Sequence, residues 1–352
     1  MGGNRHIQIA ERRIGPGEPV YVIAELSGNH RQSFEQAVKI IEQADAAGAD
    51  AVKLQTYTPD TITIQCDSEL FQTGEDSIWS GRTLYDLYGE AFTPWEWQPR
   101  LKEVANNLGL HLFSTPFDES AVAFLEQMDV PAYKIASFEL VDLPLIRRAA
   151  GTRKPLILST GMGTLSEIEE AVAAARAESD AGLALLKCTS SYPAAPDEMN
   201  LRTIPDLAER FAVCVGLSDH TTGIAVAAAA VSLGANIVEK HLTLHRADGG
   251  PDAAFSLEPR EFQEMVREIR TVERALGTVQ YGAAGREAAS RKYRRSLFIT
   301  ENLAEGTTLT RENVRSIRPG QGLPPKHYQE ILGRRVAHSV KRGTPVTWDL
   351  LI

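Results

Sequence analysis

Two histidines that end short apolar runs are the side chains whose type and spacing most directly suggest chemistry. His220 follows the apolar run 215–217, and His241 follows the shorter run 237–238. An alanine-rich helical pattern over residues 223–233 separates the two runs, which predicts a strand, a helix and a second strand. If the strands are parallel neighbours, both imidazoles lie on the rim where α/β folds place their chemistry. The pair could bind a divalent metal ion, or each histidine could be buried and hydrogen-bonded to a neighbour.

Strands and helices that would position these histidines recur along residues 1–276. Eight short apolar or β-branched runs alternate with helical patterns, which predicts an α/β fold with a (β/α)8 TIM barrel rather than an open doubly wound sheet. A capping box of Thr164 and Glu167 opens one of the helices. The expected strands are 21–25, 51–55, 111–114, 132–136, 156–159, 183–188, 215–218 and 237–240, and helical patterns include 34–47, 97–107, 120–128 and 165–177.

Two stretches interrupt this alternation. Residues 57–94 form a long insertion after the second expected strand, on the rim where the strands end, and loops of this length are usually functional or mobile. We expect residues 277–293 to be a linker. It would join the TIM-barrel domain, residues 1–276, to a small domain, residues 294–352. Within the small domain, short strand-like runs are expected at 296–299, 308–309, 336–337 and 345–346.

Polar side chains collect at the expected ends of the barrel strands. Lys53 and Lys134 interrupt runs otherwise suited to burial, and lysines rarely occupy such places without an anionic partner. Each lysine could form a structural ion pair, but hydroxyl-bearing turns beside them would also suit a phosphate or carboxylate. The turn 159–163, Ser-Thr-Gly-Met-Gly, is either a further anion site or only a tight turn. Other polar strand-end residues are Glu25, Gln55, Ser114, Thr115, Ser137, Glu139, Lys187, Thr189, Ser190, Tyr192, Ser218, Asp219 and Glu239.

Composition and charge are those of an ordinary globular protein. Hydrophobic residues make up 43% and charged residues 24% of the 352 residues. The formal net charge is −9, and residues 286–352 alone carry +7. No aromatic-interleaved basic stripe accompanies this basic tail, so nucleic-acid binding is not expected. The sequence shows no membrane span or signal peptide, and Cys66, Cys188 and Cys214, expected to be structural, fit a reducing compartment, so we expect a cytoplasmic protein.

Several of these segments, taken in order, resemble the sialic acid synthase family. The resemblance covers residues 18–352 and implies a TIM barrel followed by a C-terminal antifreeze-like (SAF) domain, for which Arg318-Pro-Gly-Gln-Gly322 is typical. The segments are Ala24-Glu-Leu-Ser-Gly-Asn-His30, Lys53-Leu-Gln-Thr56, Phe113-Ser-Thr-Pro-Phe117, Tyr133-Lys-Ile-Ala-Ser137, Leu158-Ser-Thr-Gly-Met162, Gly216-Leu-Ser-Asp-His220 and Glu239-Lys-His241.

Within the family, the resemblance is stronger to the branch that makes pseudaminic acid. Segments 53–60, 135–139 and 189–193 are similar to that branch, and segment 24–30 departs from the Ala-Glu-Ile-Gly-Ile-Asn-His pattern of the N-acetylneuraminate enzymes. The resemblance implies condensation of phosphoenolpyruvate with 2,4-diacetamido-2,4,6-trideoxy-L-altrose and release of phosphate by C–O cleavage. It also implies a divalent metal ion (Mn, Mg or Co). Synthesis of N-acetylneuraminate or legionaminic acid is the alternative within the family.

The resemblance also implies roles for individual residues. His220 and His241 would bind the metal ion that activates the sugar aldehyde. The chemistry of the reaction also calls for a general base, for which Glu25 and Glu139 are the candidates. Arg318 would reach the barrel of the partner in a domain-swapped homodimer. The residues expected at the amino sugar are Glu25, Gln55, Tyr192, Asp252 and Arg318, and those expected at phosphoenolpyruvate are Lys53, Thr115, Lys134, Ser137, Ser159, Ser218 and Ser190, the last standing where the neuraminate enzymes have asparagine.

Two interpretations outside the family stay open at this point. Lys53 or Lys134 could be the Schiff-base amine of an aldolase, because lysines at barrel strand ends can serve in that way. Alternatively, the chain could be a non-catalytic carbohydrate-binding or ice-binding protein built around its C-terminal module. The many polar strand ends of the barrel argue against this second alternative.

Overall fold

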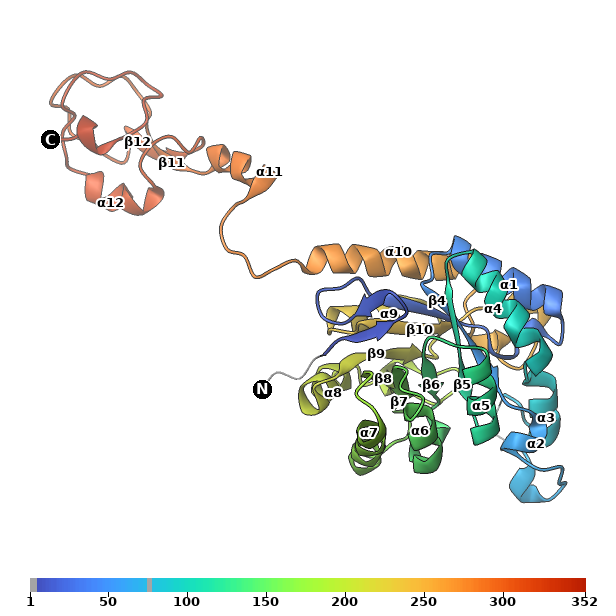
Figure 1. Cartoon of the computed structure of the whole chain (residues 1–352). Helices are drawn as coiled ribbons and strands as arrows, with labels where there is room; N and C mark the ends of the chain where they lie inside the picture. Colours follow the sequence, from blue (N-terminus) through green and yellow to red (C-terminus); the bar gives the residue numbers. More distant parts are fainter. Residues whose placement is uncertain (1–4, 75–77) are drawn as a thin grey trace. The chain divides into compact units, whose positions relative to one another are not determined.

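The chain folds into two compact units, Met1–Gly277 and Thr278–Ile352 (Figure 1). The computed structural model describes residues 5–74 and 78–352. Each unit has a hydrophobic core of its own. Part of the segment expected as a linker is helical, in α11 (Gly285–Ala288) and the 3₁₀ helix η8 (Ala289–Tyr293).

The first unit is built on a closed barrel of eight parallel strands, which confirms the fold predicted from the alternating pattern. Each strand pairs with the next in chain order, and β10 closes the ring by pairing with β3, where His241 lies opposite Glu25. All eight expected strands are present. Their bounds are β3 (Tyr21–Glu25), β4 (Ala51–Thr56), β5 (His111–Pro116), β6 (Tyr133–Ile135), β7 (Leu156–Ser159), β8 (Leu183–Cys188), β9 (Cys214–Asp219) and β10 (Ile237–His241).

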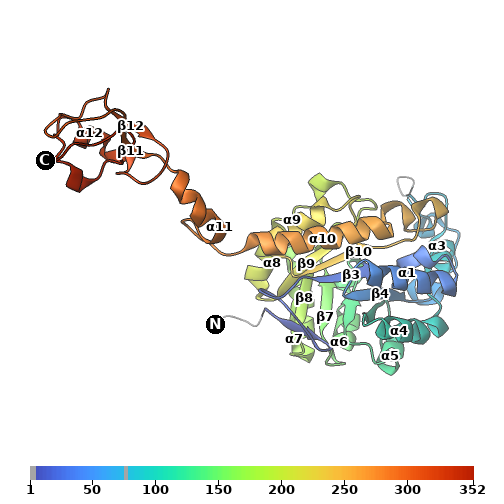
Figure 2. The same ribbon diagram turned by 90° about the horizontal axis from the view of Figure 1, so that it is seen from above.

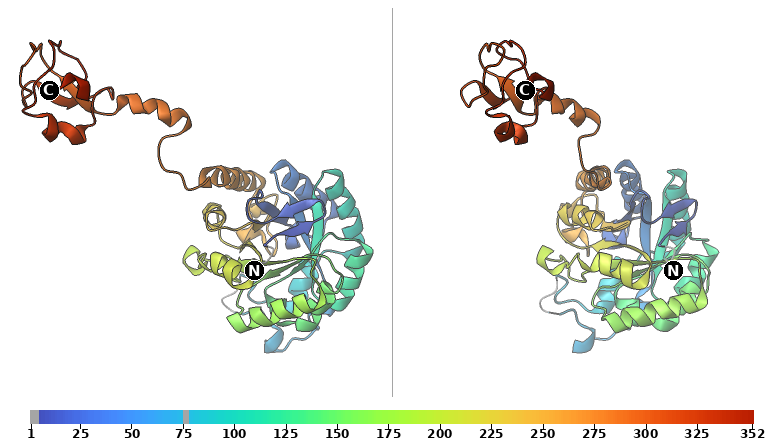
Figure 3. Two further views of the ribbon diagram at one scale, coloured as in Figure 1. Left: turned by 60° about the vertical axis from the view of Figure 1, so that its left-hand side comes forward. Right: turned by 90° about the vertical axis from the view of Figure 1, so that its left-hand side faces the viewer.

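Helices surround the barrel, as the views in Figure 3 show. Side chains cap the first turns of some of these helices: Ser33 accepts a hydrogen bond from the Gln36 amide, and Thr164 and Glu167 form the expected capping box. The helices are α1 (Phe34–Ala46), α4 (Gln98–Asn107), α5 (Glu119–Gln127), α6 (Leu143–Ala150), α7 (Leu165–Glu178), α8 (Thr203–Phe211), α9 (Ala225–Ser232) and α10 (Pro259–Leu276).

Gly216 sets how closely the two histidine-bearing strands approach. A Cβ atom added at this position in β9 would lie 2.3 Å from the carbonyl oxygen of Ile237 in β10. No side chain can be accommodated there without moving one of the strands. Glycine at this position therefore lets β9 and β10 pack closely against each other. The C-terminal ends of the two strands lie side by side, and so do His220 and His241.

The two ends of the barrel are covered differently. The hairpin of β1 (Ile7–Ile9) and β2 (Arg12–Ile14) packs its isoleucines into the barrel core at the N-terminal end of the strands. This hairpin was not expected from the sequence. The insertion after β4 forms α2 (Pro59–Ile62) and α3 (Leu84–Ala91), which lie at the opposite end (Figures 1 and 2). Residues 75–77 of the insertion lie outside the described part of the chain.

Short 3₁₀ helices connect many of the larger elements. They are η1 (Ser27–His30), η2 (Glu69–Phe71), η3 (Trp95–Trp97), η4 (Phe138–Val141), η5 (Pro196–Glu198), η6 (Arg246–Asp248), η7 (Ala253–Phe255), η9 (Pro325–His327) and η10 (Trp348–Leu350). Of these, η1, η4, η5 and η6 follow the barrel strands β3, β6, β8 and β10, and η7 packs Phe255 against His241. No helix in the described residues combines the length and apolar character that crossing a membrane requires.

The second unit is a small β-rich module. Its strand β11 (Ser296–Ile299) was expected, and it pairs antiparallel with β12 (Val314–Ile317), which was not. The other expected short runs contribute isolated bridges through Thr308, Val336 and Pro345 rather than full strands. One short helix, α12 (Tyr328–Ile331), packs Ile331 into the core of the module.

Candidate active site

A cavity of about 530 Å³ opens at the C-terminal ends of the barrel strands, beside the insertion. It brings together most of the residues that the sequence singled out, although they are spread over more than 200 positions. The predicted site residues in its wall are Glu25, Lys53, Gln55, Lys134, Ser137, Glu139, Ser159, Tyr192, Ser218, His220, His241 and Asp252. Polar residues contributed by seven different strand ends therefore face one space, as the barrel geometry requires.

Three predicted site residues are not part of this wall. Thr115 lies directly behind it and accepts a hydrogen bond from Lys53 Nζ at 3.3 Å. Ser190 packs against the turn at Gly161, where an added Cβ would lie 2.4 Å from Ser190 Oγ. Arg318 is exposed in the second unit.

Lys53 is the cation of a buried charge cluster. Its Nζ lies 3.0 Å from Glu25 Oε2 and 3.3 Å from Glu239 Oε1, and all three side chains are almost fully buried. Burial by itself would lower the pKa of Lys53, but Glu239 and Glu25 outweigh it and raise the pKa above its ordinary value. Burial also raises the pKa of Glu25 to about 7, although Lys53 opposes the shift. For Lys53, the ion-pair interpretation is therefore confirmed.

Lys134 differs from Lys53 in having no carboxylate partner among the described residues. Its Nζ donates hydrogen bonds to Ser159 Oγ at 2.6 Å and to the Ile135 carbonyl oxygen at 3.1 Å, and the side chain is 1% exposed. Burial lowers the pKa of Lys134, with Glu239 opposing the shift. A buried ammonium group with only neutral hydrogen-bond partners is an unfavourable arrangement, and Glu239 offsets it only in part because the pKa of Lys134 stays lowered, so a bound anion would complete it.

Two backbone amides of the turn 159–163, those of Thr160 and Gly161, have hydrogen-bond partners within the protein. The Gly161 amide donates to Ser137 Oγ at 3.1 Å, and Thr164 and Glu167 cap the N-terminus of α7. An added Cβ at Gly161 would also lie 2.7 Å from Ser137 Oγ. The Gly161 amide therefore helps to hold Ser137 at the cavity, and an anion site in this turn stays a prediction.

His220 and His241 stand next to each other, with ring centroids 5.3 Å apart. His220 Nδ1 lies 3.0 Å from the Thr189 carbonyl oxygen, and His241 Nδ1 lies 3.1 Å from Ser27 Oγ. A carbonyl oxygen only accepts, so the proton of a neutral His220 is on Nδ1 and its Nε2 carries a lone pair. Among the described residues, neither Nε2 has a hydrogen-bond partner.

The donor atoms of these two imidazoles suit a divalent metal ion, but two protein ligands are too few to hold the ion by themselves. Each has its Nδ1 held by a neighbour, which is the usual arrangement of a histidine that ligates through Nε2. Burial holds the pKa of His241 well below its ordinary value, so the ring is neutral, as a ligand must be. No set of three His, Cys, Asp or Glu side chains in the described residues could hold an ion alone. Water and substrate oxygens would have to supply the other positions.

Glu139 lies in the 3₁₀ helix η4, which follows β6. It faces the cavity, and its Oε2 is buried without a hydrogen-bond partner among the described residues. Burial raises the pKa of Glu139 to about 7. A carboxyl group with this pKa can accept or release a proton near neutral pH.

Three residues of the site were given no functional role in the sequence interpretation. Glu239 was noted only as a polar strand end, yet it bridges Lys53 and Ser218, whose Oγ donates to it at 3.0 Å. Cys188 was expected to be structural, but it lines the cavity with Sγ 3.8 Å from His220 Nδ1. Ser27 contacts His241. In the sequence, the only sign of a functional role for Glu239 and Cys188 is their position at the ends of strands.

Aromatic side chains form the wall beside the histidines. Tyr192 lies against His220 with ring centroids 4.6 Å apart, and Phe255 lies 4.9 Å from His241. The insertion contributes Trp79, whose ring lies 5.6 Å from Tyr192 and whose Nε1 donates to the Pro251 carbonyl oxygen at 2.7 Å. The insertion therefore helps to build the site.

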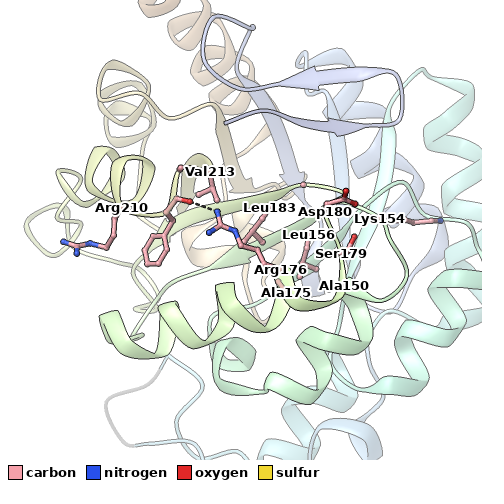
Figure 4. A pocket seen from close by; sticks show the side chains of 13 residues that line it. Ala150, Lys154, Leu156, Ala175, Arg176, Ser179, Asp180, Leu183, Arg210 and Val213 are labelled. Carbon is pink, nitrogen blue, oxygen red and sulfur yellow. Dashed lines mark hydrogen bonds between the residues drawn. The ribbon is translucent and has the colours of Figure 1, made fainter. Parts of the chain in front are cut away.

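Another hollow, of about 460 Å³, lies at the opposite end of the barrel, by the first residues of β7 and β8 (Figure 4). Its cations serve structural contacts. Arg176 donates to the Phe211 carbonyl oxygen at the end of α8, Lys154 pairs with Asp129, and Arg210 pairs with Asp206 on the same helix. The chemistry of the barrel is therefore at its C-terminal end.

Comparison with known proteins adds to this geometry. The NeuB family matches residues 40–281, and the SAF domain matches residues 294–352. The pseudaminic acid synthase of Campylobacter jejuni is 44% identical over 324 residues, covering 92% of this chain and 94% of that protein. The pseudaminic acid synthase of Helicobacter pylori is 40% identical, covering 94% and 98%. The solved structure of N-acetylneuraminic acid (sialic acid) synthetase from Leptospira borgpetersenii, in complex with citrate, is 30% identical with a TM-score of 0.71, covering 81% and 94%.

Proposed function

The chain belongs to the NeuB family, and from that premise we propose that it is a pseudaminic acid synthase. In this proposal it condenses phosphoenolpyruvate with 2,4-diacetamido-2,4,6-trideoxy-L-altrose and releases phosphate. The higher identity to the two pseudaminic acid synthases than to the sialic acid synthetase supports this substrate. N-acetylneuraminate and legionaminic acid remain the alternative products within the family.

One observation carries the proposal on physical grounds. Lys134 is a buried cation whose described partners are neutral, in the wall of a cavity that is open to a ligand. An anionic substrate that enters the cavity would supply the missing negative charge, and Ser159 and Ser137 would add hydroxyl donors beside it. Phosphoenolpyruvate offers both a phosphate and a carboxylate for this arrangement.

The reaction needs a C–C bond, the addition of water and the loss of phosphate. In the proposed sequence, the enol carbon of phosphoenolpyruvate attacks the aldehyde carbon of the open-chain sugar, and the aldehyde oxygen takes up a proton. Water then adds to the former C2 of phosphoenolpyruvate and loses a proton. Cleavage of the C2–O bond expels phosphate and leaves the keto group. Lys134 and the serines hold the anion in a fixed position through these steps and stabilise the charge on the departing phosphate.

Glu139 is the side chain best suited to accept the proton of the attacking water. It faces the cavity, lacks a cationic partner within the described residues, and has its pKa raised by burial to about 7. Glu25, the other expected base, is engaged by Lys53 and by Gln55 Nε2 at 3.0 Å. If Glu139 is the base, turnover rises with pH through about 7, and Glu139→Gln removes this rise.

We propose that His220 and His241 bind a divalent metal ion such as Mn, Mg or Co. When bound, the ion would act as a Lewis acid on the aldehyde oxygen. Treatment with EDTA is then expected to abolish turnover, and Mn²⁺ to restore it in the wild type. His220→Ala and His241→Ala should each keep the fold by circular dichroism but fail to regain activity with Mn²⁺. Full activity of either variant without metal would contradict the assignment.

The sugar end of the proposed site includes a contribution from a second copy of the chain. No arginine lines the cavity within the described residues, and Arg318 is exposed in the second unit. We propose that Arg318 acts in the barrel of a partner in a domain-swapped homodimer. Inactive Arg318→Ala and Lys134→Met chains should then recover activity when mixed under conditions that exchange subunits. Exchange without recovery would contradict it.

A substrate panel tests the proposed reaction directly. Phosphate release would be measured with phosphoenolpyruvate and each of three sugars: the 2,4-diacetamido altrose, the corresponding mannose isomer that leads to legionaminic acid, and N-acetylmannosamine. The proposal expects the highest kcat/KM with the altrose sugar. A preference for either other sugar would assign the chain to another branch of the family, and no phosphate release with any of them would reject a condensing synthase.

A Schiff-base aldolase is the second candidate, because burial lowers the pKa of Lys134 and an amine nucleophile requires that. Borohydride treatment in the presence of phosphoenolpyruvate and sugar decides between the two. The proposed reaction leaves no covalent adduct, whereas an aldolase would be trapped on Lys134 or Lys53, which mass spectrometry of the digested protein would show.

A further inference from the structure

Tyr57 is a buried tyrosine of the cavity wall that the proposed reaction does not use. It follows β4, on which Lys53 and Gln55 face the cavity, and it continues their alternation one step closer to the mouth. Its backbone carbonyl oxygen accepts a hydrogen bond from Trp95 Nε1 at 3.0 Å. The protein therefore fixes the main chain of Tyr57 while the side chain faces the space for a ligand.

The Tyr57 hydroxyl has no hydrogen-bond partner among the described residues, although the side chain is only 2% exposed. Burial raises the pKa of Tyr57 well above its ordinary value, so the hydroxyl keeps its proton and can donate. The neighbouring Tyr88 is half-buried, so its hydroxyl has more access to solvent. Buried tyrosine hydroxyl groups normally have a partner, and a ligand in the cavity would supply one for Tyr57.

The side chains around Tyr57 are mostly apolar. Its ring makes edge contacts with Tyr88, with centroids 5.7 Å apart, and with Phe117, with centroids 5.1 Å apart. Leu84 lies one turn before Tyr88 on α3 and, together with Leu87, lines the same cavity. We call these five residues, Tyr57, Leu84, Leu87, Tyr88 and Phe117, the aromatic compartment. It presents the buried hydroxyl of Tyr57 within an apolar wall.

An acetamido group matches the aromatic compartment in both of its parts. Its carbonyl oxygen is an acceptor for the phenol proton, and its methyl group suits an apolar, aromatic wall. A sugar hydroxyl in the same place would bring no methyl group, and burying it among apolar side chains costs free energy unless it is hydrogen-bonded. The compartment therefore favours an acetamido group over a hydroxyl group.

We propose that Tyr57 is a specificity residue, whose hydroxyl donates to the carbonyl oxygen of the sugar's 4-acetamido group while Phe117 and Leu87 pack against its methyl group. This inference rests on the proposed function, because it takes the sugar to be a 2,4-diacetamido hexose. The group at C4 is chosen because the group at C2 is next to the reacting aldehyde, whereas Tyr57 lies closer to the mouth than Lys53 and Gln55. Tyr57 thereby distinguishes this sugar from N-acetylmannosamine, which has a hydroxyl at C4.

Tyr57→Phe removes the hydroxyl and keeps the ring. The variant should melt at the wild-type temperature, since the lost hydroxyl has no partner in the described part of the chain. Binding is measured by calorimetry with two reduced, unreactive sugars, 2,4-diacetamido-2,4,6-trideoxy-L-altritol and its analogue with a hydroxyl at C4. The wild type should bind the diacetamido alditol more tightly. In Tyr57→Phe, the dissociation constant of the diacetamido alditol should rise about 10-fold, as expected for one lost hydrogen bond, and that of the analogue by about 2-fold at most.

Steady-state kinetics give a second readout. In Tyr57→Phe, kcat/KM for the diacetamido aldehyde sugar should fall by the same factor as the affinity for the alditol, and the KM for phosphoenolpyruvate should stay the same. A general disturbance of the cavity would change both. Tyr85→Phe is the matched control, because Tyr85 is also on α3 but donates to Asp60 Oδ1 at 3.1 Å and does not line the cavity.

Three results would overturn the assignment of Tyr57. They are a wild type that binds the two alditols equally, a Tyr57→Phe variant that keeps the wild-type preference, and equal losses in Tyr57→Phe and Tyr85→Phe. The proposed function fails separately. If the wild type prefers the mannose isomer in the sugar panel, the altrose substrate is rejected, and the 4-acetamido group of that isomer then tests Tyr57. If no sugar releases phosphate, the synthase reaction is rejected, and the alditol pair still tests Tyr57.

Discussion

Replacing Lys134 with methionine is expected to lower kcat/KM by about 10²–10³-fold while leaving the protein at least as stable as the wild type. The loss arises because the variant lacks the ammonium group that holds the anionic substrate and its departing phosphate. The stability is kept because the wild-type ammonium has only neutral hydrogen-bond partners, Ser159 Oγ and the Ile135 carbonyl oxygen, and its burial outweighs the attraction of Glu239. Methionine fills a similar volume without a buried charge. Steady-state kinetics and thermal melting measure the two effects.

Lys187→Met is the matched control for this experiment. Lys187 also stands near the end of a barrel strand, with its Nζ bonded to the Cys188 carbonyl oxygen at 2.6 Å and Thr189 Oγ1 at 3.3 Å, but it does not line the cavity. Its replacement should change kcat/KM only a few-fold. Equal losses in both variants would mean that the effect is structural, and unchanged kcat/KM in Lys134→Met would remove the main physical support for an anionic substrate.

The barrel could be predicted from the sequence because it depends on a local and repeated pattern. Runs such as 156–159 and 183–188 are apolar over the length of a strand and are followed by helical patterns, and the structure reproduces their bounds. Position at a strand end was also enough to place Lys53, Lys134, His220 and other polar residues on one rim. The N-terminal hairpin was missed because its strands have three residues each, too few to show a period.

Pairing within the site could not be predicted, because it depends on which side chains meet across strands. The sequence shows two lysines in similar surroundings, and only the structure separates Lys53, held between Glu25 and Glu239, from Lys134, held by a serine hydroxyl. Closure of the barrel pairs β10 with β3 and places His241 opposite Glu25, although 216 positions separate the two residues in the sequence. The carboxylate of Glu239 reaches Lys53 through that closure.

The contact of Ser27 with His241 could not be predicted for the same reason. Ser27 lies after the first barrel strand, whereas His241 ends the last, which pairs with the first. Their meeting requires the ring to close and the backbone at Ser27 to turn through a positive φ. Neither requirement leaves a periodic trace in the sequence. The resemblance to the sialic acid synthase family, which the comparisons confirm, indicated Asp252 but not Ser27.

Replacing Lys53 with methionine is expected to have the opposite effect on stability from the same change at Lys134. It would leave Glu25 and Glu239 buried together without their cation, and breaking a buried ion pair in this way costs about 3–5 kcal/mol of unfolding free energy. The loss should depend on pH, because burial already raises the pKa of Glu25 to about 7 and removal of Lys53 raises it further. When folding raises the pKa of a carboxyl group, the group stabilises the folded state fully at pH values below its pKa in the unfolded chain. This contribution is lost as the pH rises through its pKa in the folded protein.

The stability deficit of Lys53→Met, measured by urea unfolding, should therefore be small near the ordinary pKa of a glutamate and largest above pH of about 7. Lys53→Met combined with Glu25→Gln is the compensating variant: it removes one of the two carboxylates, so much of the deficit at high pH should disappear although turnover stays low. Arginine at position 53 keeps the charge and should keep most of the stability. A Lys53→Met protein as stable as the wild type above pH of about 7, or a deficit that grows as pH falls, would show that the Lys53 cluster is not held by these charges.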